Sequence, residues 1–200
     1  MALPFFDSGA TTKRDQVVAI DLGGRTTKAV FLQRKEEHYQ LNRYALLDAP
    51  IYEKALSAEM LTEHLRAVCQ ALDARGKPVA IALGVNDAFL RHVEMPRMPR
   101  EDLRLVLKNN SRNYLQEDLV NYVYDCFLVP QRALPVVGDY GKPAAPAPKQ
   151  KVLVAGARKQ LVEEFLAAIK ATGMVAAHIV PGLLGPVNTF EAAMPEVFSR

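Results

Sequence analysis

The sequence has few of the features that mark secreted, membrane-spanning or metal-binding proteins. Its two cysteines, Cys69 and Cys126, lie far apart inside regular-looking segments, which indicates buried thiols rather than a disulfide. No cysteine and histidine residues have metal-ligand spacing, and no apolar run approaches the ~20 residues of a membrane span. The first residues also lack the apolar core of a signal peptide. These absences favour a protein of the reducing cytoplasm.

The chain also lacks a large net charge of either sign. The 25 basic residues nearly balance the 22 acidic residues, so the net charge of +3 does not point to a nucleic-acid partner. Half of the 200 residues are apolar, which is enough to bury the core of one large domain or two small ones. The Walker A spacing of glycine, lysine and serine or threonine is also absent.

The most informative stretch is 17–32, where two short apolar runs flank a polar turn. The runs predict two strands, and the glycines between them bend the backbone and leave N–H groups unobstructed. Such a hairpin tip can cradle a phosphate, and the carboxylate at its entrance can hold Mg²⁺ through water. The alternative is a hairpin turn without a ligand. The candidate phosphate-binding residues are Asp21, Gly23, Gly24, Arg25, Thr26, Thr27 and Lys28, with Asp21 as the candidate metal residue.

Neighbouring residues of a strand point to opposite faces, so at most one of Thr26 and Thr27 is expected to face a phosphate. A third strand is predicted over 39–47, and Ser57 is the predicted N-cap of a helix whose apolar residues recur at three- and four-residue steps. That helix is expected to stop at Gly76, before a buried strand over 77–84. The predicted order is therefore three strands, a helix and a fourth strand.

After residue 85 the sequence contains more prolines and different element boundaries. Prolines at 96 and 99 end a strand, and the loop at 130–150 contains five prolines and two glycines, too many for a regular element. The predicted order of this part is strand, helix, strand, loop, strand, helix, strand. The corresponding ranges are 89–95, 101–114, 119–129, 130–150, 151–157, a helix that stops at 173, and 174–180.

The spacing Asp-x-Gly-x-x-x-x-Lys from Asp21 to Lys28 resembles the first phosphate motif of the ATPase superfamily that contains actin, hexokinase and the heat-shock chaperones. Two further segments narrow the resemblance. The Met-Pro-x-Met-Pro sequence at 95–99 and the Val-Leu-Val-Ala-Gly-Ala-Arg-Lys sequence at 152–159 are similar to the PilM family of type IV pilus assembly, which is related to FtsA. Matching positions run over 17–188. The segment 114–119 departs from the family because it is more polar than in many relatives.

The resemblance implies an α/β fold, an actin-like ribonuclease H-like core (βββαβ) with an inserted FtsA/PilM-type β-α-β subdomain, of which this chain holds the first lobe only. The implied divisions are a flexible leader at 1–15, the core at 16–86, the inserted subdomain at 87–178 with a mobile loop at 130–150, and a return to the core at 179–200. The chain is expected to stop before the second lobe, through truncation or as a naturally short protein.

The resemblance also implies a function. It is that of a cytoplasmic scaffold, peripheral on the inner membrane, which belongs to the type IV pilus assembly platform and docks the N-terminal cytoplasmic peptide of PilN in a groove beside the inserted subdomain. ATP and Mg²⁺ are the cofactors implied for the full-length protein. ATP hydrolysis and self-association are left open.

Two other functions remain open. A small-molecule kinase of the same superfamily needs an aspartate base beside the acceptor hydroxyl, and Asp87 is the residue that follows the fourth strand. A GspL-like module of a type II secretion platform would share the fold without using a nucleotide.

Other charged residues receive structural interpretations. The basic residues that recur every four positions over 100–112 are read as a solvated helix face, with an acidic partner or anionic lipid as the alternative. Asp125 interrupts an apolar strand without a visible partner, and neither it nor Asp139 is assigned a catalytic role. The four histidines, His38, His64, His92 and His178, are too scattered to predict a ligand cluster.

Overall fold

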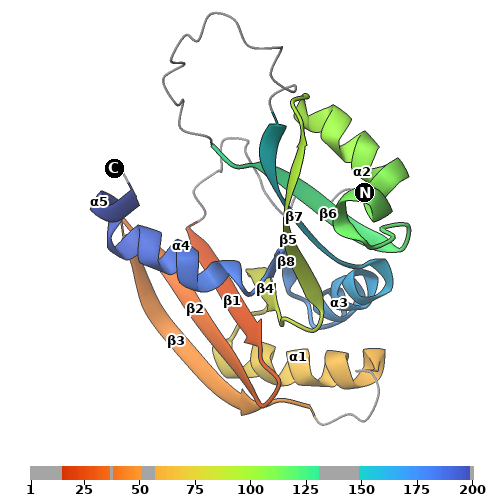
Figure 1. Cartoon of the computed structure of the whole chain (residues 1–200). Helices are drawn as coiled ribbons and strands as arrows, with labels where there is room; N and C mark the ends of the chain where they lie inside the picture. The colour runs from red at the N-terminus through yellow and green to blue at the C-terminus, as the bar shows by residue number, and fades with distance from the viewer. Residues whose placement is uncertain (1–14, 37, 51–56, 131–148, 199–200) are drawn as a thin grey trace, which may run out of the picture.

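The computed structural model describes residues 15–36, 38–50, 57–130 and 149–198, which form two sheets with their covering helices (Figure 1). The first sheet has five strands in the order β3-β2-β1-β4-β8. Its first three strands form an antiparallel meander, and β4 and β8 run parallel to β1. The strands are β1 (Gln16–Leu22), β2 (Thr26–Lys35), β3 (His38–Asp48), β4 (Pro78–Leu83) and β8 (Val175–Pro181).

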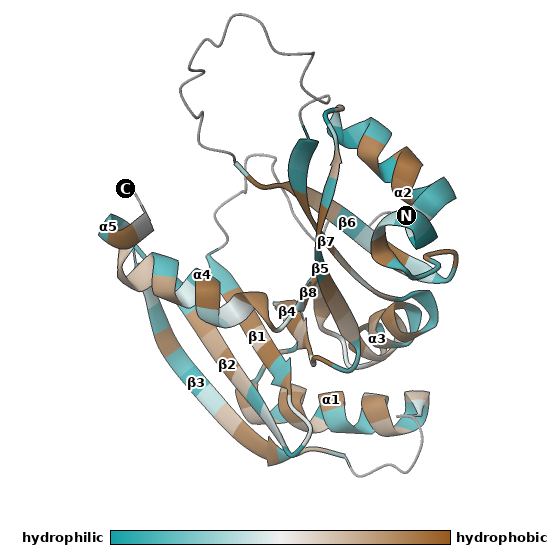
Figure 2. Cartoon of the chain, in the orientation of Figure 1, coloured by the Kyte–Doolittle hydropathy of each residue, from teal (hydrophilic) through white to brown (hydrophobic). Residues whose placement is uncertain are grey.

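Two helices, α1 (Ala58–Leu72) and α3 (Lys159–Ala171), pack against this sheet and share its hydrophobic core. Figure 2 shows brown and teal bands along α1, as expected for a helix with one buried face. The buried residues of α1 are those predicted from the spacing: Leu61, Leu65, Val68, Cys69 and Leu72. The helices α4 (Leu184–Ala193) and α5 (Pro195–Phe198) follow β8.

The N-terminus of α1 lies where the sequence predicted it, and its C-terminus does not. The Ser57 hydroxyl accepts a hydrogen bond of 3.2 Å from the Met60 N–H, which confirms the predicted N-cap. The helix ends at Leu72 rather than next to Gly76, because Asp73 itself adopts the left-handed conformation with φ of 50°. Aspartate tolerates this conformation better than most residues, so the glycine was not needed to stop the helix.

The second sheet has three antiparallel strands in the order β5-β7-β6, with β7 in the middle. The strands are β5 (Ala88–Pro96), β6 (Tyr122–Leu128) and β7 (Lys149–Arg158), and the helix α2 (Arg100–Leu115) packs against them. This unit buries its own hydrophobic cluster, which includes Val93, Met95, Leu103, Leu107, Val152 and Val154. It is the inserted subdomain of the predicted fold.

The inserted subdomain is smaller than the range 87–178 expected from the sequence. The strand β8 pairs with β4, and the apolar face of α3 lies in the core cluster of the five-stranded sheet. Residues 159–178 therefore pack as part of the core, because their buried side chains face α1 rather than α2. The predicted leader at 1–15 and loop at 130–150 lie almost entirely outside the described residues. In the described part of the chain, no helix is long and apolar enough to cross a membrane.

Asp125 has partners that the sequence did not reveal. Its carboxylate is 1% exposed and accepts hydrogen bonds from Arg100 Nη2 at 2.9 Å and from Arg104 Nη2 at 2.6 Å. Both arginines belong to α2, so the interpretation of the basic stripe as a solvated face is wrong for these two residues. Lys108 and Arg112 of the same stripe are exposed, as predicted. Farther along the helix, Arg112 forms an exposed ion pair with Asp118 at 2.8 Å. The buried carboxylate thus ties the start of α2 to the strand β6.

Replacing Asp125 with alanine is expected to destabilise the protein by about 3 kcal/mol, because two guanidinium groups would lose their shared anion. The free energy of unfolding is measured by urea titration. The matched control is Arg112→Ala, which breaks the exposed pair with Asp118 and should cost less than about 1 kcal/mol. Equal losses in the two variants would show that the Asp125 cluster contributes no more than a surface ion pair.

Candidate functional site

The turn between β1 and β2 brings together two of the predicted phosphate-binding residues. Asp21 and Lys28 are direct partners in the antiparallel register, and Lys28 Nζ donates a hydrogen bond of 3.2 Å to Asp21 Oδ2. The two side chains are 48% and 60% exposed, so both charged groups remain accessible to a ligand. The turn itself is linked to the end of β3, because the Ala49 N–H donates a 2.9 Å hydrogen bond to the Arg25 carbonyl.

The two glycines of the turn have different roles. A Cβ on Gly23 would lie 2.7 Å from the Thr26 carbonyl oxygen, a separation that real Cβ atoms do not tolerate. A Cβ on Gly24 would have no atom of the described residues within 4 Å apart from those of its chain neighbours. Gly23 therefore allows the backbone to close the turn, whereas Gly24 leaves open space beside it.

Thr27 faces the interior and is not accessible to a phosphate. It is fully buried, and its Oγ1 shares a 2.7 Å hydrogen bond with Nε2 of His64 on α1. Burial lowers the pKa of His64 below its ordinary value, because desolvation disfavours the charged imidazolium. Thr26 occupies the same side of β2 as Lys28, in agreement with the prediction that at most one hydroxyl faces a ligand.

His64 is a site residue that the sequence reasoning missed. It follows Leu61 by three residues and so lies near the buried face of α1, which was a usable signal for contact with the sheet. Its partner is 37 positions away, and the pairing depends on how α1 crosses the hairpin.

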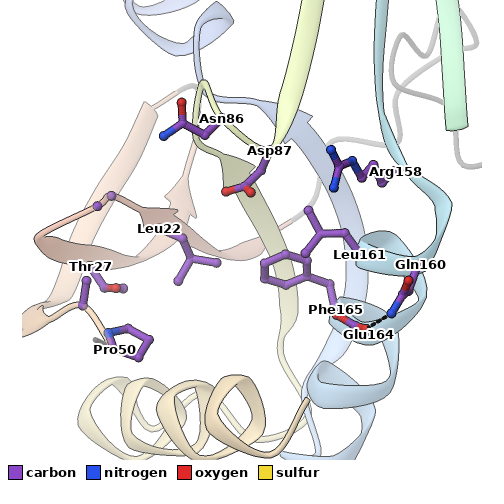
Figure 3. A pocket seen from close by; sticks show the side chains of 13 residues that line it. Leu22, Thr27, Pro50, Asn86, Asp87, Arg158, Gln160, Leu161, Glu164 and Phe165 are labelled. Carbon is purple, nitrogen blue, oxygen red and sulfur yellow. Dashed lines mark hydrogen bonds between the residues drawn. The ribbon is translucent and has the colours of Figure 1, made fainter. Parts of the chain in front are cut away.

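A pocket of about 460 Å³ lies on the Thr27 side of the turn. It opens at the edge of the sheet where the parallel strands β4 and β8 end, a common location for ligand sites in open α/β sheets. Figure 3 shows the side chains that converge on it from the turn, from the connection between β4 and β5, and from α3. The lining residues are Leu22, Gly23, Gly24, Thr27, Ala49, Pro50, Asn86, Asp87, Arg158, Gln160, Leu161, Glu164 and Phe165.

The pocket combines an apolar floor with charged groups at its rim. Leu161 and Phe165 of α3 supply apolar surface, and the charged residues Asp87 and Arg158 also line the cavity (Figure 3). Burial raises the pKa of Asp87 above its ordinary value, and the positive charge of Arg158 acts in the opposite direction. The Gln160 side-chain amide donates a 2.9 Å hydrogen bond to Glu164. Such a pocket suits a ligand with both apolar and polar groups.

The residues of the turn fit the phosphate and Mg²⁺ of a nucleotide. Gly23 sits where a Cβ would not fit, Gly24 leaves its surroundings open, and Lys28 supplies an accessible cation. Among the described residues, no three His, Cys, Asp or Glu side chains gather as a metal site. One carboxylate, Asp21, is nevertheless enough for a Mg²⁺ that keeps several waters and binds mainly to phosphate oxygens.

Comparison with solved structures identifies similar folds. A chain described as "PilM-PilN type IV pilus biogenesis complex" matches with a TM-score of 0.69 at 19% identity, over 90% of this chain and 51% of that one. The cytoplasmic domain of EpsL, an inner-membrane component of the type II secretion system of Vibrio cholerae, matches with a TM-score of 0.53 at 15% identity, over 84% of this chain and 58% of that one. The likeness is one of fold.

The likeness in fold to the chain of the PilM-PilN complex confirms the α/β fold class predicted from the sequence. The five-stranded core sheet has one strand more than the predicted βββαβ core, because β8 pairs with β4. This chain spans 51% and 58% of the length of these two structures. No protein-family model matches the sequence. No curated protein matches it either.

Gly23→Ala is expected to destabilise the protein by about 1–3 kcal/mol, because the added methyl group must push the Thr26 carbonyl out of place. Gly24→Ala serves as the matched control, since its methyl group enters open space and should change the unfolding free energy by less than about 1 kcal/mol. Urea unfolding of the two variants measures the difference. Similar stabilities would contradict the close approach at Gly23.

Proposed function

We propose that this chain is the nucleotide-binding part of a cytoplasmic scaffold in a type IV pilus assembly platform, peripheral on the inner membrane, which docks the N-terminal cytoplasmic tail of a PilN-type membrane protein. The fold likeness to the PilM-PilN complex, which extends over 90% of this chain, is the observation that carries the proposal. The motif from Asp21 to Lys28 and the pocket beside it supply the sites that such a scaffold requires.

The nucleotide part of the proposal rests on the β1–β2 turn. Lys28 would contact phosphate oxygens as a point charge, the turn amides of Gly23 and Gly24 would donate to them, and Asp21 would orient the water shell of Mg²⁺. Bound Mg²⁺ would supply charge neutralisation for the phosphates. The ion pair between Asp21 and Lys28 keeps both side chains at the same edge of the hairpin until such a ligand takes its place.

The docking part of the proposal rests on the pocket. Its walls come from the core turn and from residues 86–87 and 158, where the chain passes to and from the inserted subdomain. A peptide side chain could bury apolar surface on Leu161, while polar groups of the peptide meet Asp87, Arg158 and Glu164 at the rim.

A GspL-like module of a type II secretion platform is the second candidate, and the likeness to the EpsL cytoplasmic domain favours it. The two candidates differ in nucleotide use, so measurement of MgATP binding separates them. A small-molecule kinase has less support. Asp87 lines the pocket on the Thr27 side of the turn, whereas Asp21 and Lys28 lie on the other side, so the candidate base does not face the proposed phosphate site.

Lys28→Ala in the full-length protein is expected to weaken MgATP binding by about 1–3 kcal/mol, the scale of a lost charge-assisted hydrogen bond. Isothermal titration calorimetry measures the dissociation constant. Lys151→Ala removes an exposed lysine from the subdomain strand β7 and should leave it unchanged. An unaltered affinity in the Lys28 variant would remove this residue from the nucleotide site.

Leu161→Ala is expected to weaken binding of the PilN N-terminal peptide by about 1–2 kcal/mol, because the apolar floor of the pocket loses area. The dissociation constant is measured by titration with a synthetic peptide that has the N-terminal sequence of PilN from the same organism. The control is Val120→Ala, which alters an exposed subdomain residue that does not line the pocket. Absence of binding by the unmodified protein would refute docking, and equal binding by the Leu161 variant would place the peptide elsewhere.

A further inference from the structure

The β1–β2 turn separates two sites that lie on its opposite faces. Asp21 pairs with Lys28, and the next pair in the register is Leu22 with Thr27. Because side chains alternate along both strands, these two pairs point to opposite faces of the sheet. The pocket is lined by Leu22 and Thr27 and not by Asp21 or Lys28. The proposed phosphate site and the pocket therefore share the turn as a common wall.

The turn has little freedom to move independently of the pocket. At Gly23 there is no room even for a methyl group, so the backbone is closely packed against Thr26. Thr27 is held to α1 through His64, and the Arg25 carbonyl is held by the N–H of Ala49, another pocket residue. A shift of the turn therefore shifts two parts of the pocket wall with it.

The open space at Gly24 is the place where a pocket ligand can act on the turn. Apart from the two chain neighbours, no atom of the described residues lies within 4 Å of a Cβ built there, and Gly24 lines the pocket. A ligand group that packs into this space contacts the same turn whose amides are proposed to hold phosphate. A ligand changes an equilibrium only through a difference in its interaction with the two states, so the coupling requires that bound phosphate changes the position of the turn.

We infer that the β1–β2 turn couples the two sites, so that occupancy of the pocket changes the affinity of the turn for a polyphosphate. This inference rests on the proposed function, because it requires MgATP to bind at Asp21 and Lys28. Thermodynamic linkage makes the effect reciprocal: the nucleotide changes the affinity of the pocket for its ligand by the same factor. In the proposed scaffold, nucleotide binding would thereby regulate the docking of the membrane partner.

The coupling can be tested with an environment-sensitive fluorophore placed at the pocket. Gln160 is exposed and lines the pocket, and the two native cysteines are buried, so a maleimide dye attaches selectively to the variant Gln160→Cys in the full-length protein. The control is Val175→Cys, which is 54% exposed at the start of β8, at the opposite end of the parallel strands from the turn. Each labelled protein is titrated with MgATP.

We expect MgATP to change the dye emission of the Gln160 variant, with a midpoint equal to the dissociation constant from calorimetry, and to leave the Val175 variant unchanged. Reciprocity also predicts that the dye in the pocket changes the MgATP dissociation constant at least threefold relative to the unlabelled variant. MgATP binding without either effect, or with the same response at both positions, would overturn the coupling alone. If calorimetry detects no MgATP binding to the unlabelled protein, the nucleotide part of the proposed function fails and the inference fails with it.

Discussion

The central position of β1 in the sheet is the constraint on which the site depends. This strand pairs antiparallel with β2 on one side and parallel with β4 on the other, so its end is fixed in two directions. The turn that follows must therefore lie at the edge where β4 and β8 also end. Residues of the turn, of the β4–β5 connection and of α3 meet there only because this pairing is formed. The hydrogen-bonded pairing of β1 with its two neighbours thus determines where the Asp21–Lys28 pair and the pocket lie.

The inserted subdomain is held together by a different interaction. Its three strands and α2 bury a separate hydrophobic cluster, and the Asp125 carboxylate orients α2 through two arginines. Gly156 contributes a packing constraint, because a Cβ there would lie 2.6 Å from the Phe89 ring and 2.9 Å from the Tyr124 Cβ. Residues 86–87 and 158, which line the pocket, lie where the chain enters and leaves this subdomain. Most of the cavity lining therefore comes from the core and its connection to β5, and the subdomain contributes Arg158 at the end of β7.

The fold class could be predicted because its signals are local. The glycines between two apolar runs predicted the β1–β2 hairpin, and the stripe of apolar residues after Ser57 predicted α1. Boundaries were less accurate, as at Asp73, where a residue other than glycine adopts the left-handed conformation. The assignment of α3 and β8 to the inserted subdomain also differed from the structure, because an amphipathic pattern shows that one face is buried but does not show which neighbour covers it.

The sequence by itself determined the order of the elements, the hairpin with its aspartate, glycines and lysine, and the burial of the apolar stripes. These features depend on turn chemistry and on side-chain periodicity within a few residues. Only the tertiary structure decided that Thr27 binds His64 rather than a ligand, that Asp125 joins Arg100 and Arg104, and that the pocket lies on the opposite side of the turn from Lys28. Each of these facts joins residues that are distant in the sequence, and such contacts follow from strand register and helix crossing, which no local pattern specifies.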